Sequence, residues 1–318
     1  MKKVIRIIVI IFIAILLGAI IGAIYWFNGN IEAKPSEENN YNIAEEKFAQ
    51  RKVFVLTPKT EKSNKVILYL HGGAYVGEIE QEHWLFFNEI IKDTNATIIV
   101  PDYPLAPQYN YEDAFNMVLP LYEKILEKVK QENLILMGDS AGAGMSLSLV
   151  QKIAEDKLVQ PSKTILISPW LDVTMSNKEI DEVQKRDTKL NKNILKIVGI
   201  VYAKTEENTT NYLVSPIYGK LEGLSDLVIY TGTNDILNPD VHILEKKLNS
   251  VKINEYEGAI HNWILEKYVD EKYNNELSKK AYENLIYELN ETRLYSEALQ
   301  LLDTYDELLY NEIRWLNE

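Results

Sequence analysis

The sequence predicts an α/β fold with a mostly parallel central sheet flanked by helices, and two observations support this. From Arg51 onward, short runs rich in Val, Ile, Leu and Tyr alternate with longer segments whose apolar residues recur at helical spacing. The short runs are almost continuously apolar, which is typical of strands that helices cover on both faces. Such alternation indicates parallel strand pairs joined by helical crossovers. The 318 residues are enough for one large domain with additional segments at its ends.

Individual elements follow from these patterns in chain order. Seven short apolar runs predict strands at residues 53–56, 66–70, 97–100, 134–137, 164–167, 227–230 and 251–256. Three segments with a clear helical period predict helices at residues 114–129, 141–153 and 241–248. The region before Arg51 is rich in Asn and Glu, and we expect it to form a short stalk that runs into a polar helix.

Composition excludes several classes of protein. The chain has 34 Lys and Arg against 47 Asp and Glu, for a formal net charge of −13, and no basic cluster lies beyond its first six residues. Nucleic acid is therefore excluded as a partner, because phosphate contact needs a positive surface. The absence of Cys excludes disulfides, Cys-ligated metals and a Cys nucleophile. The four His residues form no HExxH motif, so we expect no metal site.

The N-terminal segment predicts a membrane anchor. Lys2, Lys3 and Arg6 precede an uncharged apolar run at residues 7–27, whose 21 residues span about 31 Å as a helix. A secretory signal peptide is the alternative, but its apolar region is shorter and ends in a small-x-small cleavage site, which this region lacks. A buried core helix would need a polar face, and this run has none.

Charges on either side of the apolar run predict its orientation. Three acidic residues follow the run, Glu32, Glu37 and Glu38, with only Lys34 among them, whereas three basic residues precede it. The positive-inside rule then places the N-terminus in the cytoplasm and the remaining chain outside the cell, attached by a single span. Tyr25 and Trp26 lie where interfacial aromatic residues are expected.

A nucleophilic serine is predicted at the first motif that carries chemistry. Gly138-Asp139-Ser140-Ala141-Gly142 follows one predicted strand directly and opens a predicted helix. A strand-to-helix turn this tight strains its central residue and exposes that side chain, and flanking glycines avoid collisions. A lone G-x-S-x-G is a weak signal, but its position between a strand and a helix strengthens it.

A serine hydroxyl needs a base and an orienting carboxylate to become nucleophilic. Asp235 follows the strand at residues 227–230, and His261 follows the strand at residues 251–256, in the chain order Ser, Asp, His that this fold class uses. Taken alone, Asp235 could be a turn former and His261 a structural histidine. Asp240 is the alternative acid, although it lies beyond a proline where a helix is expected to begin and its carboxylate would serve the helix N-terminus.

Backbone donors for an oxyanion are predicted in His71-Gly72-Gly73-Ala74, immediately after the strand at residues 66–70. Two consecutive glycines let backbone N–H groups converge on a substrate oxygen, and the N–H of Ala141 would complete the site. The alternative is a simple glycine turn. His71 is expected to brace this loop rather than to act as a base.

Taken together, these motifs resemble the hormone-sensitive-lipase-like esterases of the α/β-hydrolase superfamily. The resemblance covers about residues 53–263. It is carried by five ordered motifs: His71-Gly72-Gly73-Ala74, Asp102-Tyr103-Pro104-Leu105-Ala106-Pro107, Gly138-Asp139-Ser140-Ala141-Gly142, Ser168-Pro169-Trp170-Leu171-Asp172, and Asp235-Ile236-Leu237 with His261. The chain departs from the family pattern at Ala74, where a third glycine is usual, and at Pro104 and Gln108.

The resemblance implies an α/β-hydrolase fold and a serine esterase that needs no cofactor. It implies a triad of Ser140, Asp235 and His261, with Gly72, Gly73 and Ala141 donating to the oxyanion. Three further residues in or beside the matched motifs are expected to contact substrate: Ala74, Tyr75 and Trp170. The family cleaves small to medium carboxylic esters under a small helical cap. Residues 173–213, and part of 31–50, would form that cap.

The C-terminal region predicts an amphipathic helix. Residues 266–318 contain 13 acidic and 6 basic residues, and apolar residues recur at spacings of four and three from Leu294 to Leu308. Two heptads are too few to indicate a coiled coil, so docking on the body is favoured over a homo-oligomer or partner interface.

The sequence therefore predicts four parts and one leading function. The parts are a cytoplasmic stub with a transmembrane anchor (1–27), a stalk and candidate cap segment (28–50), a catalytic domain (51–290) and an amphipathic tail helix (291–318). The leading function is a cell-membrane-anchored, outward-facing serine esterase for small-molecule esters. An amidase or peptidase with the same triad and a catalytically silent binding protein that uses the tail are the alternatives.

Overall fold

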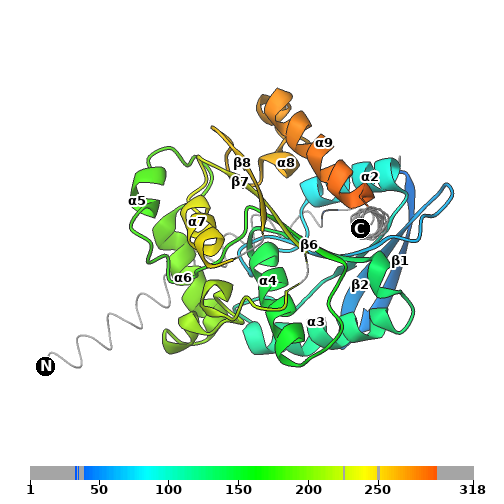
Figure 1. The fold of residues 1–318 in the computed structure, drawn as a ribbon, viewed down its shortest axis with the longest axis horizontal. Coiled ribbons are helices and arrows are strands. Elements are labelled where there is room, and N and C mark those ends of the chain that lie inside the picture. The colour runs from blue at the N-terminus through cyan, green and yellow to red at the C-terminus, as the bar shows by residue number, and fades with distance from the viewer. Residues whose placement is uncertain (1–32, 34, 36–38, 225, 249–250, 292–318) are drawn as a thin grey trace, which may run out of the picture.

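A twisted eight-stranded sheet forms the centre of the protein in the computed structural model, which describes residues 33, 35, 39–224, 226–248 and 251–291 (Figure 1). The strand order is β1-β2-β4-β3-β5-β6-β7-β8. The strands are β1 (Tyr41–Phe48), β2 (Arg51–Pro58), β3 (Val66–Leu70), β4 (Thr97–Pro101), β5 (Leu134–Asp139), β6 (Lys163–Ile167), β7 (Asp226–Gly232) and β8 (Lys252–Tyr256). From β4 to β8 all neighbours are parallel, which confirms the predicted mostly parallel sheet.

Helices cover both faces of the sheet within the described residues. They are α2 (Gln81–Thr94), α3 (Tyr111–Leu126), α4 (Ser140–Glu155), α5 (Ile180–Val183), α6 (Lys192–Ala203), α7 (Asn238–Lys247), α8 (Trp263–Glu266) and α9 (Glu276–Asn290). Successive side chains of a strand point to opposite faces. On β3, Leu68 and Leu70 therefore join the core with α3, α4 and α7, whereas Ile67 and Tyr69 join the core with α2, α8 and α9.

All seven predicted strands and all three predicted helices overlap elements of the structure. The polar helix expected before Arg51 is wrong, because residues 41–48 form strand β1 at the edge of the sheet. Six consecutive β1 side chains, from Asn42 to Lys47, are exposed, so the strand shows no apolar alternation. Pairing with β2 across a tight turn at Ala49 and Gln50, both with positive φ, decides its conformation.

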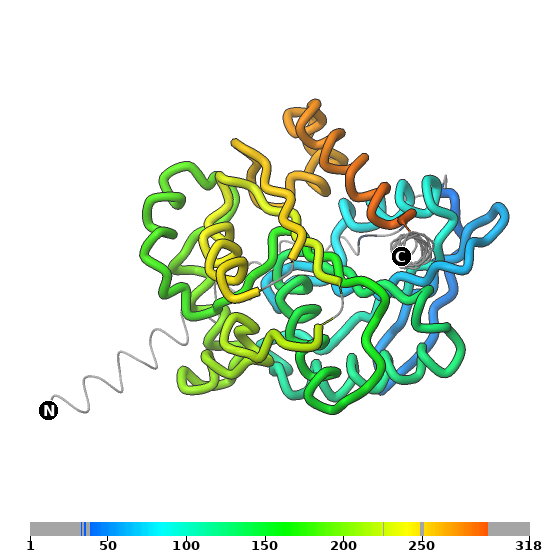
Figure 2. Tube along the Cα trace, viewed as in Figure 1, coloured from blue at the N-terminus to red at the C-terminus, as the bar shows by residue number. Residues whose placement is uncertain are grey.

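An irregular insertion joins β6 to β7 and includes α5 and α6. It coincides with the segment expected to be a cap at residues 173–213, and it lies beside α7 in the backbone trace (Figure 2). One of its contacts with the body is made by Tyr202 on α6, whose ring stacks on that of Tyr75 with 3.7 Å between the ring centroids.

Two predicted segments lie outside the described residues. They are the anchor at residues 7–27 and nearly all of the amphipathic tail at residues 291–318, so both stay predictions. Across the part of the chain that the structure describes, none of the helices combines the length and the apolar character that crossing a membrane would take.

Candidate active site

Ser140 lies on a sharp turn between β5 and α4, as the motif predicts. Its φ of 51° is in the left-handed region, which is strained for a residue with a side chain. Close packing explains Gly142, since a Cβ there would lie 2.0 Å from the backbone oxygen of Leu70 on β3. The carbonyl oxygen of Ser140 accepts the N–H of Trp170 at 3.0 Å, which ties the turn to the end of β6.

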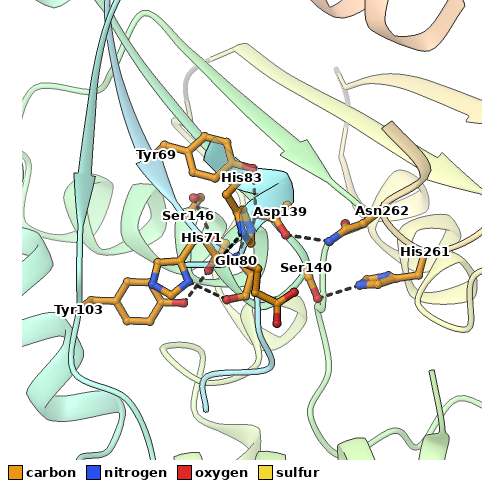
Figure 3. Close-up of polar contacts among 12 residues, drawn as sticks. Tyr69, His71, Glu80, His83, Tyr103, Asp139, Ser140, Ser146, His261 and Asn262 are labelled. Carbon is orange, nitrogen blue, oxygen red and sulfur yellow. Dashed lines mark hydrogen bonds and ion pairs between the residues drawn. The ribbon is translucent and has the colours of Figure 1, made fainter. Parts of the chain in front are cut away.

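Three side chains predicted from separate parts of the sequence meet at this turn. The hydroxyl of Ser140 lies 2.9 Å from His261 Nε2, and His261 Nδ1 lies 2.8 Å from Asp235 Oδ2 (Figure 3 shows the Ser140–His261 pair). A carboxylate accepts only, so Nδ1 carries the proton and Nε2 presents a lone pair to the serine hydroxyl. The second oxygen of Asp235 accepts the N–H of Leu237 at 2.9 Å, which holds the carboxylate in place.

His261 is a stronger base in this arrangement than an ordinary histidine. Burial lowers the pKa of His261, but the charge and hydrogen bond of Asp235, together with the carboxylates of Asp187 and Asp139, outweigh burial, so the net pKa is raised above 6.5. The side chains of all three residues are largely shielded from water, with Ser140 and His261 each 7% exposed and Asp235 fully buried. The arrangement can take a proton from the serine and stabilise the resulting imidazolium.

The alternative acid, Asp240, does not reach His261. It lies in the first turn of α7, where its Oδ1 accepts from Asn177 Nδ2 of the insertion at 2.9 Å. The position of Asp235 at the end of β7 is therefore the one that the structure brings to the histidine.

In the glycine loop after β3, the backbone N–H of Gly72 is not placed as the predicted oxyanion donor. The N–H of Gly72 donates to Asp139 Oδ1 at 2.9 Å, so it is not free for a substrate oxygen. A Cβ on Gly72 would lie 2.2 Å from the other oxygen of Asp139, so this close approach explains the glycine. Gly73, with a φ of 101°, and Ala141, at the start of α4, have backbone N–H groups without hydrogen-bond partners among the described residues.

His71 braces the loop, in agreement with the sequence. Its Nδ1 donates to the carbonyl oxygen of Gly72 at 2.8 Å, and its ring stacks on that of Tyr103 with 4.4 Å between the centroids. The hydroxyl of Tyr103 donates to the carbonyl oxygen of His71 at 2.6 Å. Burial lowers the pKa of His71 to about 4, so its ring is neutral at physiological pH.

Asp139, which directly precedes the serine, connects several elements around the site. It is fully buried, and its Oδ1 accepts from the hydroxyl of Tyr69 at 2.8 Å, the N–H of Gly72 and His83 Nε2 at 3.2 Å. Its Oδ2 accepts from Asn262 Nδ2 at 2.7 Å. Figure 3 shows Tyr69, His83 and Asn262 around Asp139, next to Ser140.

This geometry agrees with the comparisons to known proteins. A family described as the alpha/beta hydrolase fold matches residues 67–265, which is more than half of the chain. The chain is an α/β hydrolase. The resemblance to hormone-sensitive-lipase-like esterases is thereby confirmed, and it extends to solved structures. They include a candidate esterase from Staphylococcus aureus (TM-score 0.78, 25% identity, 86% of this chain and 92% of that chain) and an esterase of the bacterial hormone-sensitive lipase family (TM-score 0.70, 20% identity, 79% and 84%).

Two relatives found by sequence similarity are named as an esterase and an acetyl-hydrolase. An esterase of Acinetobacter venetianus is 28% identical over 60% of this chain and 63% of the relative. An acetyl-hydrolase of Streptomyces hygroscopicus is 27% identical over 64% of this chain and 69% of the relative. This α/β hydrolase therefore spans slightly less than two thirds of the Acinetobacter protein.

Two of the three residues expected to contact substrate have another role in this α/β hydrolase. Tyr75 is 1% exposed and Trp170 is 0% exposed, and their rings stack on each other with 5.6 Å between the centroids. The ring of Tyr202 also stacks on that of Tyr75. Tyr75 and Trp170 therefore form a buried aromatic stack beside the site, while Ala74 is only half-buried and has a φ of 53°.

Sequence reasoning missed Asp139, His83 and Asn262 as parts of the site. Asp139 is part of the serine motif, but no sequence pattern indicated which side chains form hydrogen bonds with it. Its bonds to His83 and Asn262 cross 56 and 123 residues of sequence. Within the described residues, no group of three or more His, Asp or Glu side chains could hold a metal ion.

Proposed function

We propose that this α/β hydrolase is a carboxylesterase that works through an acyl-enzyme on Ser140. The observation that carries the proposal is the continuous hydrogen-bonded line from the hydroxyl of Ser140 through His261 to Asp235. The hydrogen-bonded arrangement of Ser140, His261 and Asp235 argues against a catalytically silent binding protein, because binding alone does not require these three side chains to be in contact. The relatives named esterase and acetyl-hydrolase support the ester as substrate class.

The proposed reaction has two steps of the same kind. Ser140 Oγ attacks the ester carbonyl carbon while its proton passes to His261 Nε2, and the imidazolium then protonates the departing alcohol. Water attacks the acyl-enzyme with His261 again as the base, which releases the carboxylic acid and restores the serine. We assign the backbone N–H groups of Gly73 and Ala141 as donors to the oxyanion that forms in each step.

We further propose that this site favours small acyl groups. The aromatic stack of Trp170, Tyr75 and Tyr202 packs beside Gly144 on α4, where a Cβ would lie 2.2 Å from the carbonyl oxygen of Trp170 and 3.1 Å from the hydroxyl of Tyr75. A space already filled by large rings leaves little room for a long acyl chain. We therefore expect acetyl and propionyl esters to be cleaved faster than octanoyl esters.

An organophosphonate probe and the Ser140→Ala variant test the function. The probe should label the wild-type chain once and should not label the variant, whose hydrolysis of p-nitrophenyl acetate should fall on the order of 10⁴- to 10⁶-fold. A matched control is Ser146→Ala, because Ser146 lies on the same helix and its hydroxyl donates to the carbonyl oxygen of Gly142 rather than to His261. Undiminished turnover in Ser140→Ala would overturn the proposal.

We also propose that residues 7–27 anchor the enzyme in the cell membrane, with the N-terminus cytoplasmic and the hydrolase domain outside. The apolar run and the basic residues before it support this placement. Protease added to intact cells should remove the hydrolase domain and leave the N-terminus protected. Recovery of a shortened chain beginning near Asn28 in the medium would instead indicate a cleaved signal.

A further inference from the structure

Two adjacent residues, His261 and Asn262, contact two adjacent residues of the serine turn, Ser140 and Asp139. His261 contacts Ser140, and the next residue, Asn262, donates through Nδ2 to Asp139 Oδ2 at 2.7 Å (Figure 3). The backbone N–H of Asn262 also donates to the hydroxyl of Ser168, at the end of β6, at 3.1 Å. The turn that carries the histidine is therefore held to the turn that carries the serine by a second, parallel contact.

The Asp139 side of this contact is buried, hydrogen-bonded and ionised. Burial raises the pKa of Asp139, but its contact with His83 and the hydrogen bond from Tyr69 outweigh burial, so the net pKa is lowered. The N–H of Glu80 donates to His83 Nδ1 at 3.0 Å, so His83 carries its proton on Nε2 and donates it to Asp139. An ionised carboxylate only accepts, so the amide of Asn262 must present its nitrogen and can hold only one orientation.

The backbone of Asn262 does not by itself require an amide side chain. Its φ of 52° and ψ of 28° lie in the left-handed region, which Asn tolerates and Gly adopts at lower cost. What the amide adds at this position is the hydrogen bond to Asp139. A glycine can adopt the same backbone conformation and removes that bond, while it also makes the backbone more flexible.

We propose that Asn262 is a positioning residue that fixes His261 Nε2 relative to the hydroxyl of Ser140 by binding Asp139. This role rests on the proposed function, in which His261 accepts the serine proton and then donates it to the leaving alcohol. Both transfers need Nε2 within hydrogen-bond reach of its partner. A looser histidine turn harms the second transfer most, because an alkoxide departs poorly without a proton, whereas p-nitrophenolate departs without one.

The test compares the Asn262→Gly and wild-type full-length proteins on ethyl acetate and p-nitrophenyl acetate. The value of kcat/KM, which reports acylation, is measured per site titrated with organophosphonate. We expect it to fall about 10- to 100-fold on ethyl acetate and at least about threefold less on p-nitrophenyl acetate. The matched control is Asn95→Gly, since Asn95 has the same φ of 52° but lies at the end of α2 with its side chain bound to Thr60. The control should retain wild-type kcat/KM on both esters.

A second variant keeps the test informative if Asn262→Gly folds poorly. Asn262→Ala has no side-chain donor that reaches Asp139, and activity per titrated site compares only folded enzyme, so we expect the same discrimination between esters. Unchanged activity in the folded variants, or an equal loss on both esters, would overturn the positioning role. Ser140→Ala separates the two proposals: if it stays active the proposed function fails, and if it is inactive while Asn262→Gly is normal only the positioning role fails.

Discussion

Replacing Asp240 with Asn should stabilise the protein at alkaline pH. The Asp240 side chain is 1% exposed, its Oδ1 accepts from Asn177, and its Oδ2 has no partner within the described part of the chain. Burial raises the pKa of Asp240 from 3.8 to about 7, and the nearby carboxylates of Asp172 and Glu179 add to this. An ionised Asp240 is therefore an unfavourable group in the folded protein above neutral pH.

The sign and size of the effect follow from proton binding. Between about pH 4 and pH 7 the folded protein retains a proton on Asp240 that the unfolded chain has lost, so the free energy of unfolding falls as pH rises through this range. A difference between 3.8 and about 7 corresponds to at most about 4 kcal/mol. The helix N-terminus favours a carboxylate by about 0.3 to 1 kcal/mol, so we expect a net gain of about 1 to 3 kcal/mol.

Urea unfolding at pH 5 and pH 8.5 measures this prediction. Asp240→Asn should gain stability relative to wild type at pH 8.5 and little at pH 5, because the amide keeps the bond with Asn177 and cannot ionise. Asp226→Asn is the matched control, since Asp226 is exposed at the start of β7 and should show no such pH dependence. Esterase activity should persist in both variants. A variant less stable than wild type at pH 8.5 would refute the reasoning.

Two further predictions concern the proposed triad. Asp235→Asn replaces the acceptor for His261 Nδ1–H, so turnover should fall on the order of 10⁴-fold with an unchanged unfolding midpoint, and near-normal turnover in p-nitrophenyl acetate assays would contradict the role. Because the net pKa of His261 is raised above 6.5 and the imidazolium cannot accept a proton, kcat/KM should decline as pH falls through an apparent pKa above 6.5. A pH–rate profile with its acid limb below that value would show that Asp235 does not control the histidine.

Local patterns determined most of the fold. Apolar runs such as residues 66–70 and 134–137 predicted β3 and β5 because a strand buried on both faces must be apolar throughout. The glycine spacing around Ser140 predicted the sharp turn because only a residue without a side chain fits beside β3 at Gly142. Strand β1 escaped prediction, because an edge strand with exposed charged side chains has no such pattern.

The sequence by itself also determined which residues meet at the serine. Asp235 and His261 each follow a parallel strand, and the carboxyl ends of parallel strands lie at one edge of the sheet. The order of the motifs along the chain and their positions after predicted parallel strands therefore predicted that Ser140, Asp235 and His261 meet, and the hydrogen bonds at 2.9 and 2.8 Å agree with that expectation.

Only the tertiary structure decided how the neighbours of these residues are used. The Gly72 N–H turned toward Asp139, Tyr75 and Trp170 entered a buried stack, and Asn262 reached across 123 residues of sequence to the same carboxylate. Hydrogen-bond partners and burial depend on which distant side chains share a space of a few ångströms. The sequence pattern indicates whether a segment is a helix or a strand. It does not indicate how the side chains of different elements pack, because that depends on how the helices and loops are arranged on the sheet.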